Sequence, residues 1–270
     1  MATTMRGTLV ILVVALGLLA TACSGDNASS AAGEPDPPVG KPLLPDLAPS
    51  PPQDIQMGRV QGEWHIKFSS ILVNLGKGDF VLRATREQGS TWSAEQDVQY
   101  SSSGAKPIPV DSPLAWGGDG HEHWHIQRVA SVWLVPLDAN GKPASDSKER
   151  IDTKIGFCFY DFTRLLENGP EEAVYSRESC GHEDDTKIGM GLSIGWTDNY
   201  VYDLPGQSID VTGLPDGAYR LWTAVDEQGW FRETTRKNNV SWADVELSTE
   251  ANGDRTVEVT DPGPAIRPPS

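Results

Sequence analysis

Three histidines occupy alternate positions in the stretch His121-Glu122-His123-Trp124-His125. In an extended strand, alternate side chains point to the same face, which would bring the three imidazoles together with the Cα atoms of successive histidines about 6–7 Å apart. Neutral imidazole is a favoured ligand of copper, zinc, nickel and iron. Because the chain has five histidines in 270 residues, this clustering predicts a metal site at His121, His123 and His125. The alternative is a polar, partly exposed strand, and the spacing does not select the metal.

The elements that must position these histidines are short. Apolar runs rich in β-branched and aromatic residues alternate with Gly, Asn, Asp and Pro, which is typical of strands joined by turns. Residues 68–75 and 80–84, joined by Gly76-Lys77-Gly78-Asp79, predict a hairpin. We therefore predict an all-β fold, a β-sandwich of short antiparallel strands with long loops and at most a short helix. The other predicted strands are residues 129–136, 151–160, 208–212, 219–225 and 240–247.

No long segment of the sequence shows the 3.6-residue periodicity of an amphipathic helix. We place the short helix near residues 162–168 and expect long loops at residues 86–114 and 168–187. Loops of this kind often carry the residues that select substrates.

The first 22 residues predict a signal peptide. They carry one charge, Arg6, followed by an apolar run at residues 9–20 that is short for a transmembrane helix. The end of this segment, Ala20-Thr21-Ala22-Cys23, resembles the bacterial lipoprotein processing box, in which the cysteine becomes the lipidated first residue of the mature chain. Cleavage after Ala22 without lipidation is the alternative. We expect a lipid-anchored protein on the extracellular side of a bacterial cell membrane, or otherwise a secreted one.

Composition divides the remaining chain into three parts. Residues 23–52 are rich in Ser, Ala, Gly and Pro, a composition that cannot bury a core, and we interpret them as the lipidated N-terminus and an extended tether. Residues 53–260 have the length of one domain with a sizeable core. Residues 261–270 are Pro-rich and are predicted to be a disordered tail. Within the tether, Leu44-Pro45-Asp46-Leu47 marks the expected beginning of order.

The mature chain is strongly acidic. Without Arg6 of the signal peptide, 21 basic residues face 38 acidic ones, which gives a formal charge of −17. This charge argues against nucleic acid and anionic membrane surfaces as partners, so contact with the membrane is expected through the lipid anchor only. It favours cationic partners such as amines, lysine-rich proteins or metal ions, although solubility explains most of these charges equally well.

Cysteine usage is informative as well. If Cys23 is lipidated, Cys158 and Cys180 are the two remaining thiols in an oxidising compartment, and we expect them to form a disulfide. Closing a loop of about 20 residues would stabilise the fold by about 3 kcal/mol on the chain-entropy model. Thiolate ligation of a metal is the alternative.

Several segments, taken in chain order, resemble the lysyl oxidase family. The His-x-His-x-His motif is followed by a Lys-x-x-Phe-Cys segment at Lys154 and by Gly-Leu-Ser-x-Gly-x-x-Asp-x-Tyr ending at Tyr200. The spacing from Tyr200 to Tyr219 also fits, as do Asn238-Asn239-Val240 and the opening Leu44-Pro45-Asp46-Leu47. The resemblance covers nearly all of the predicted folded part, so residues 53–260 resemble a lysyl oxidase catalytic domain.

The resemblance implies both the cofactors and the activity. Family members bind copper through the three histidines, here His121, His123 and His125, and carry lysine tyrosylquinone, whose two parent positions match Lys154 and Tyr200. It implies a copper- and quinone-dependent oxidoreductase that acts on CH–NH₂ groups with dioxygen as acceptor. Such an enzyme converts primary amines or peptidyl-lysine to aldehydes and releases ammonia and hydrogen peroxide. Without the resemblance, Lys154 would be interpreted as a solvent-facing strand lysine and Tyr200 as an aromatic covering the core.

Two questions stay open at the level of sequence. The general base is not identified by any motif, and the candidates are Asp198, Asp203, His65 and His182, the two histidines also being candidate fourth ligands. The alternative function is a catalytically silent copper-binding β-sandwich that serves in metal handling or adhesion. The chain also has Gly-Gly-Asp-Gly at residues 117–120, where the animal enzymes have a Trp-His-x-Cys segment, so collagen or elastin specificity does not transfer.

Overall fold

β-strands account for nearly all of the regular structure. The computed structural model describes residues 37–89, 91–117, 121–144, 150–152 and 156–266, and it gives only the backbone for 150–152. These residues form strands β1 to β18 and one short 3₁₀-helix, η1 (Arg177–Cys180), with no α-helix among them. The predicted all-β fold is therefore confirmed. The predicted signal peptide, Cys23 and Lys154 lie outside the described residues.

Three antiparallel sheets and one two-stranded ribbon organise the unit Asp36–Ser270. The first sheet has the order β1-β6-β5-β13, with β7 also paired to β6: β1 (Pro42–Leu43), β5 (Phe80–Gln88), β6 (Thr91–Tyr100), β7 (Ala105–Val110) and β13 (Lys187–Leu192). The second has the order β11-β10-β16-β17-β18: β10 (Ala130–Pro136), β11 (Arg150–Asp152), β16 (Gly217–Val225), β17 (Val240–Thr249) and β18 (Arg255–Asp261).

The third sheet is built on the long strand β4. Its order is β12-β14-β4-β15, with β2 and β3 also paired to β4: β2 (Leu47–Pro49), β3 (Gln53–Val60), β4 (Glu63–Asn74), β12 (Thr163–Arg164), β14 (Trp196–Tyr200) and β15 (Ser208–Asp210). The separate ribbon consists of β8 (Leu114–Trp116) and β9 (Trp124–Ile126). Among the described residues, no helix is long and apolar enough to cross a membrane.

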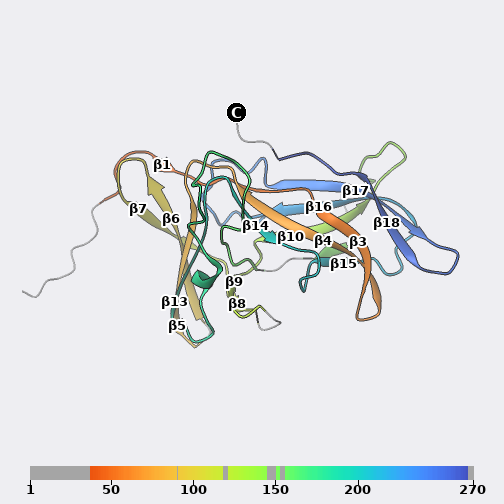
Figure 1. The fold of residues 1–270 in the computed structure, drawn as a ribbon, viewed down its shortest axis with the longest axis horizontal. Helices are drawn as coiled ribbons and strands as arrows, with labels where there is room; N and C mark the ends of the chain where they lie inside the picture. Colours follow the sequence, from red (N-terminus) through yellow and green to blue (C-terminus); the bar gives the residue numbers. More distant parts are fainter. Residues whose placement is uncertain (1–36, 90, 118–120, 145–149, 153–155, 267–270) are drawn as a thin grey trace, which may run out of the picture. The chain divides into compact units, whose positions relative to one another are not determined.

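The second and third sheets pack face to face. Alternate residues of β4, including Ile66 and Phe68, are buried against inward-facing residues of β10, β16 and β17 such as Leu134, Leu221 and Val245. Period-2 alternation places these side chains on one face of each strand, so the strands form the predicted sandwich. Figure 1 shows these strands grouped together, apart from β5, β6, β7 and β13.

A second core positions the histidine motif. Phe80 and Leu82 of the first sheet, Trp124 and Ile126 of β9, and residues on β14 belong to one buried cluster. The apolar residues that alternate with the histidines thus hold β9 against the first sheet. Burial of these large side chains provides a rigid base for the imidazoles.

Three predictions about local structure were wrong. Strands β4 and β5 are joined by the turn at Gly76–Asp79 but do not pair, because β4 pairs with β14 and β5 with β6 and β13. The expected loop at 86–114 contains β6 and β7 instead. The expected helix near 162–168 is absent, since Thr163 and Arg164 pair with Thr197 and Trp196 as β12.

The described parts of the predicted tether and of the predicted tail both contribute to the folded unit. Strand β2 is buried and pairs with β4, and Ile266 packs against the small apolar cluster of Ala48, Val73 and Leu75. Order therefore extends beyond 53–260 on both sides, close to the Leu44–Leu47 segment where the sequence indicated its beginning.

Candidate metal centre

The three histidines bring their ring nitrogens together. One ligand atom from each of His121, His123 and His125 lies within 4.8 Å of the others. The ring centroids are 5.7 Å apart for His121 and His123, 5.4 Å for His121 and His125, and 4.6 Å for His123 and His125. His125 is buried, whereas His121 and His123 are half-buried. This is the one group of three or more candidate metal ligands found among the described residues.

The local backbone differs from the single extended strand that we expected. Strand β9 begins at Trp124, and before it the His123 N–H donates to the His121 carbonyl at 2.9 Å, which is a tight turn. The Gly117 N–H donates to the His123 carbonyl at 3.1 Å and ties the turn to the end of β8. The imidazoles therefore converge because the chain turns around a common point.

Two glycines make room for the His125 ring. A Cβ added at Gly117 would lie 2.6 Å from Cε1 and 2.8 Å from Nδ1 of His125. A Cβ at Gly156 would lie 2.4 Å from the His125 Cβ. Reciprocal backbone hydrogen bonds between Ile126 and Phe157, of 3.0 and 2.8 Å, hold the second glycine beside the ring.

Tyr200 lies next to the imidazoles at the end of β14. Its ring centroid is 6.2 Å from that of His121, 6.4 Å from that of His125 and 4.5 Å from that of Phe157. The side chain is buried, and its hydroxyl accepts a hydrogen bond of 2.9 Å from the Cys158 backbone N–H. The structure thus brings Tyr200 and the three histidines together.

Burial and nearby charge shape the ionisation of the phenols. Burial raises the pKa of Tyr200 well above its usual value, the charge of Asp198 adds to this, and the Cys158 N–H acts in the opposite direction. Burial and Asp198 also raise the pKa of Tyr160, while Arg177 lowers it. Asp198 lies two residues before Tyr200 on the same face of β14 and is fully buried.

A cavity of about 390 Å³ opens over the histidines and Tyr200. It is a mixed polar and apolar space, with both acidic and basic groups on its wall. Its lining consists of His121, Glu122, His123, Tyr160, Arg177, Glu178, Gly181, His182, Asn199, Tyr200 and Leu204.

A disulfide supplies one side of this cavity. Cys158 and Cys180 are bonded, as predicted, with their Cα atoms 5.8 Å apart. The bond places η1 and the following residues beside the site, which brings Arg177, Glu178 and His182 to the cavity. Thiolate ligation of a metal is excluded in this oxidised form.

The candidate bases and fourth ligands named from the sequence differ in whether they line the cavity. His182 lines the cavity, whereas His65 lies on β4 with its Nδ1 3.1 Å from the Ser208 hydroxyl, and neither His65 nor Asp203 lines it. Sequence reasoning missed Tyr160, Arg177 and Glu178. No motif marks these residues, and the only signal was that Arg177 and Glu178 lie within three residues of Cys180.

The residues present fit a transition metal. Three imidazoles, one of them buried, form a nitrogen donor set of the kind that copper and zinc prefer. Gly117 leaves space for the buried ring and Gly156 for the Cβ that carries it, which fixes one donor. The site therefore has the ligand type and the rigidity that a bound metal requires.

Comparisons with known proteins agree with this geometry. The lysyl oxidase family model matches residues 102–254. Lysyl oxidase homolog 2B of Danio rerio is 22% identical over 175 residues, 65% of this chain and 18% of that protein. Lysyl oxidase homolog 2 of Gallus gallus is 26% identical over 133 residues, 49% of this chain and 15% of that protein. The chain thus spans less than a fifth of the length of these relatives.

The matched region includes the histidine turn, both disulfide cysteines and β14 with Tyr200. Since it covers more than half of the chain, the protein belongs to the lysyl oxidase family.

Proposed function

We propose that this protein is a copper-dependent amine oxidase with a lysine tyrosylquinone cofactor formed from Lys154 and Tyr200. His121, His123 and His125 hold the copper in this proposal. The observation that carries it is the placement of the buried Tyr200 ring beside three converging imidazoles. Membership of the lysyl oxidase family supports an oxidoreductase, and the substrates proposed are primary amines or peptidyl-lysine.

The chain near Lys154 supports its pairing with Tyr200. Lys154 precedes Phe157 and Cys158 by three and four residues. The Phe157 ring lies 4.5 Å from the Tyr200 ring, centroid to centroid, at a tilt of 53°, and the Cys158 N–H donates to the Tyr200 hydroxyl. Two residues that closely follow the lysine in sequence thus contact the tyrosine.

The overall reaction balances as RCH₂NH₂ + O₂ + H₂O → RCHO + NH₃ + H₂O₂. The amine loses two electrons, and dioxygen is reduced by two electrons to hydrogen peroxide. When present, the quinone supplies the two-electron acceptor that no standard side chain provides, and copper supplies the redox chemistry that forms it from the tyrosine.

The described residues would serve this chemistry in distinct ways. The Cys158 N–H fixes the direction of the Tyr200 hydroxyl, and Phe157 fixes the plane of the ring. Burial of Tyr200 limits access to its ring to the side that faces the cavity. The cavity is large enough to admit an amine side chain. As candidate bases we propose Asp198, which is buried two residues before Tyr200, and His182, which lines the cavity.

Location is part of the proposal. The Cys158–Cys180 disulfide is typical of proteins outside the cytosol. We place the protein on the extracellular side of the membrane, anchored by lipid at Cys23, with secretion as the alternative. Dioxygen and amines are its proposed partners, and nucleic acid is not.

Peptide mapping of aerobically copper-loaded protein tests the cofactor. Mass spectrometry is expected to find the Lys154 and Tyr200 peptides covalently joined, and a hydrazine reagent is expected to trap a carbonyl on the joined pair. Two unmodified peptides after full copper loading would overturn the oxidase proposal and leave a copper-binding protein.

Two tyrosine variants make this test specific. Tyr200→Phe is expected to bind copper but to show neither the cross-link nor quinone absorbance. Tyr160→Phe removes the other phenol that lines the cavity and is expected to keep the cross-link. A cross-link that persists in Tyr200→Phe would identify Tyr160 as the precursor and contradict the assignment.

A further inference from the structure

His182 is an exposed histidine whose backbone is fixed on the rim of the metal cavity. Its side chain lines the same cavity as His121 and His123. It follows the disulfide cysteine Cys180 by two residues, in the turn that leaves η1. From the sequence it was one of two histidines that could serve as a base or as a fourth ligand.

The backbone on both sides of His182 is anchored at successive residues. Cys180 is held by its disulfide, and Gly181 has a φ of 75°, with Ile188 Cγ2 only 2.5 Å from the position of an added Cβ. The His182 N–H donates to Asp185 Oδ2 at 2.7 Å, and Arg86 Nη2 donates to the carbonyl of the next residue, Glu183, at 2.6 Å. These contacts fix the position of the His182 backbone at the cavity rim and leave χ1 and χ2 to set where its imidazole points.

A further anchor of the His182 backbone comes from the histidine motif itself. Trp124, between His123 and His125, donates its Nε1–H to the His182 carbonyl at 2.9 Å. The Arg86 guanidinium also lies over the Trp124 ring, 4.7 Å from its centroid. The position of His182 is therefore coupled to the turn that carries the other imidazoles.

We propose that His182 supplies a fourth imidazole to the copper centre, an inference that rests on the proposed function because it requires copper at the three histidines. Cu(II) favours tetragonal sets of nitrogen and oxygen donors, which three protein ligands leave incomplete. The donor atoms within 4.8 Å of one another come from His121, His123 and His125, so the proposal requires the exposed His182 side chain to rotate about χ1 and χ2 toward them. A copper-bound His182 could not also act as the base, which leaves Asp198 for that role. A solvent-facing rim histidine would not need this degree of anchoring.

Pulsed and continuous-wave electron paramagnetic resonance of the Cu(II)-loaded full chain tests the assignment. Wild-type protein is expected to show four coordinated imidazoles. His182→Gln is expected to show three and to bind Cu(II) at least about 10-fold more weakly in a competition titration. Glu183→Gln is the matched control on the same turn and is expected to match the wild type in both measurements.

The outcomes separate this inference from the proposed function. Three imidazoles in wild-type protein, or an unchanged spectrum and affinity in His182→Gln, would overturn the role of His182 and leave the oxidase proposal intact. Failure of wild-type protein to bind Cu(II), or full affinity in His123→Gln, would overturn the copper centre itself. The imidazole count in wild-type protein needs no variant, so a folding defect in His182→Gln would not obscure the result.

Discussion

Tyr200 combines two properties that oppose each other. Its burial and the charge of Asp198 raise the pKa of its hydroxyl, which keeps the phenol protonated in the protein alone. The same burial places its ring against His121 and His125, where a divalent cation would favour the phenolate. On the proposed function, the phenol would ionise only once the imidazoles hold a metal ion.

The space around His125 gives a sharp test at the residue scale. In Gly117→Ala, the new methyl would lie 2.6 Å from His125 Cε1 and 2.5 Å from the His121 carbonyl oxygen, so the ring or the turn must move. We expect the protein to fold but to lose about 10- to 100-fold in Cu(II) affinity, as when other supports of metal ligands are removed. Isothermal titration with copper under a competing chelator measures this.

Gly189→Ala is the matched control, because its added methyl meets nothing closer than the Leu82 carbonyl oxygen at 3.8 Å. It is expected to bind copper as the wild type does. Equal affinity in both alanine variants would contradict the view that the glycine beside His125 shapes the metal site.

At the scale of elements, the disulfide links the cavity rim to the tyrosine. Cys180 ends η1, and Cys158 donates its backbone N–H to Tyr200. We expect Cys158→Ser/Cys180→Ser to lower the free energy of unfolding by about 3 kcal/mol, because the unfolded chain regains the entropy of a 22-residue loop. Urea unfolding of this variant and of oxidised wild-type protein gives the difference.

Wild-type protein unfolded in the presence of a reductant provides the companion measurement. Its loss of stability is expected to match that of the double serine variant. A loss much below about 1 kcal/mol in both cases would show that η1 is held by its other contacts rather than by the bond.

The sequence predicted the class of the fold and the strands that alternate cleanly, but not how they pair. Ile66 and Phe68 of β4 show the period-2 pattern of a sandwich strand, and the structure confirms their burial. The hairpin with β5 was wrong because a turn sequence fixes a reversal, not the partner of each strand. Partners are chosen by contacts with distant segments, which local sequence does not contain.

Strand β6 shows why a whole element was missed. Its inward position Gln96 is polar, so Thr91–Tyr100 lacks the apolar alternation of a half-buried strand. Gln96 is fully buried, and its amide accepts from the Arg232 N–H at 2.7 Å and donates to the Arg232 carbonyl at 3.0 Å. A backbone partner 136 residues away thus replaces the apolar contact that the pattern requires.

The metal site, too, has parts that the sequence predicts and parts that it does not. The metal donors could be predicted because the three histidines alternate within five residues of the sequence. The disulfide could be predicted because two thiols remain once Cys23 is assigned to lipidation. Tyr160 and Arg177 could not, because the disulfide and the packing of β9 bring them to the cavity only in the folded chain.

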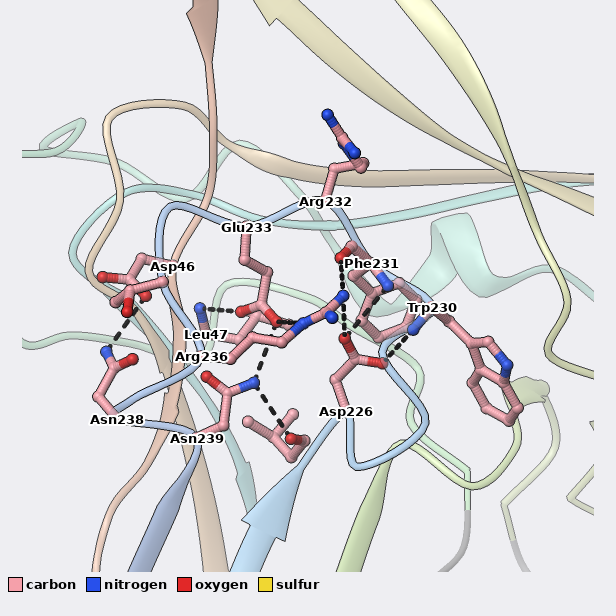
Figure 2. A network of polar contacts seen from close by, with 12 residues as sticks. Asp46, Leu47, Asp226, Trp230, Phe231, Arg232, Glu233, Arg236, Asn238 and Asn239 are labelled. Carbon is pink, nitrogen blue, oxygen red and sulfur yellow. Dashed lines mark hydrogen bonds and ion pairs between the residues drawn. The ribbon is translucent and has the colours of Figure 1, made fainter.

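At the scale of the whole molecule, a buried acidic network joins β2 near the start of the folded unit to the segment before β17. Figure 2 shows the Glu233 side chain between Leu47, at the start of β2, and Asn239, just before β17. Its carboxylate accepts from the Leu47 N–H at 2.8 Å and from Asn239 Nδ2 at 3.0 Å. Asp226 and Asp46 lie in the same network, and the cation paired with its carboxylates is Arg236, 3.5 Å from Asp226 and 4.0 Å from Glu233.

This excess of acid over base makes stability depend on pH. Burial raises the pKa of Glu233 to about 8, and it also raises the pKa of Asp226 and of Asp46. Between the ordinary glutamate value of 4.5 and about 8, the folded state therefore binds more protons than the unfolded state. The free energy of unfolding consequently falls as pH rises through this window, by at most about 1.4 kcal/mol per pH unit for one group.

Glu233→Gln removes the group with the largest resolved shift in the network, and we expect it to flatten the decline of stability between pH 5 and about 8. The quantity to compare is the slope with pH from urea unfolding, since the amide also changes the hydrogen bonds to Leu47 and Asn239. Glu250→Gln, at an exposed glutamate, is expected to keep the wild-type slope. A wild-type slope in Glu233→Gln would show that Asp226 and Asp46 hold the protons instead.

Because the network binds β2 to the segment before β17, we expect its ionisation at alkaline pH to loosen β2 first. Hydrogen exchange at the Leu47 amide, measured across the same pH range, would detect this.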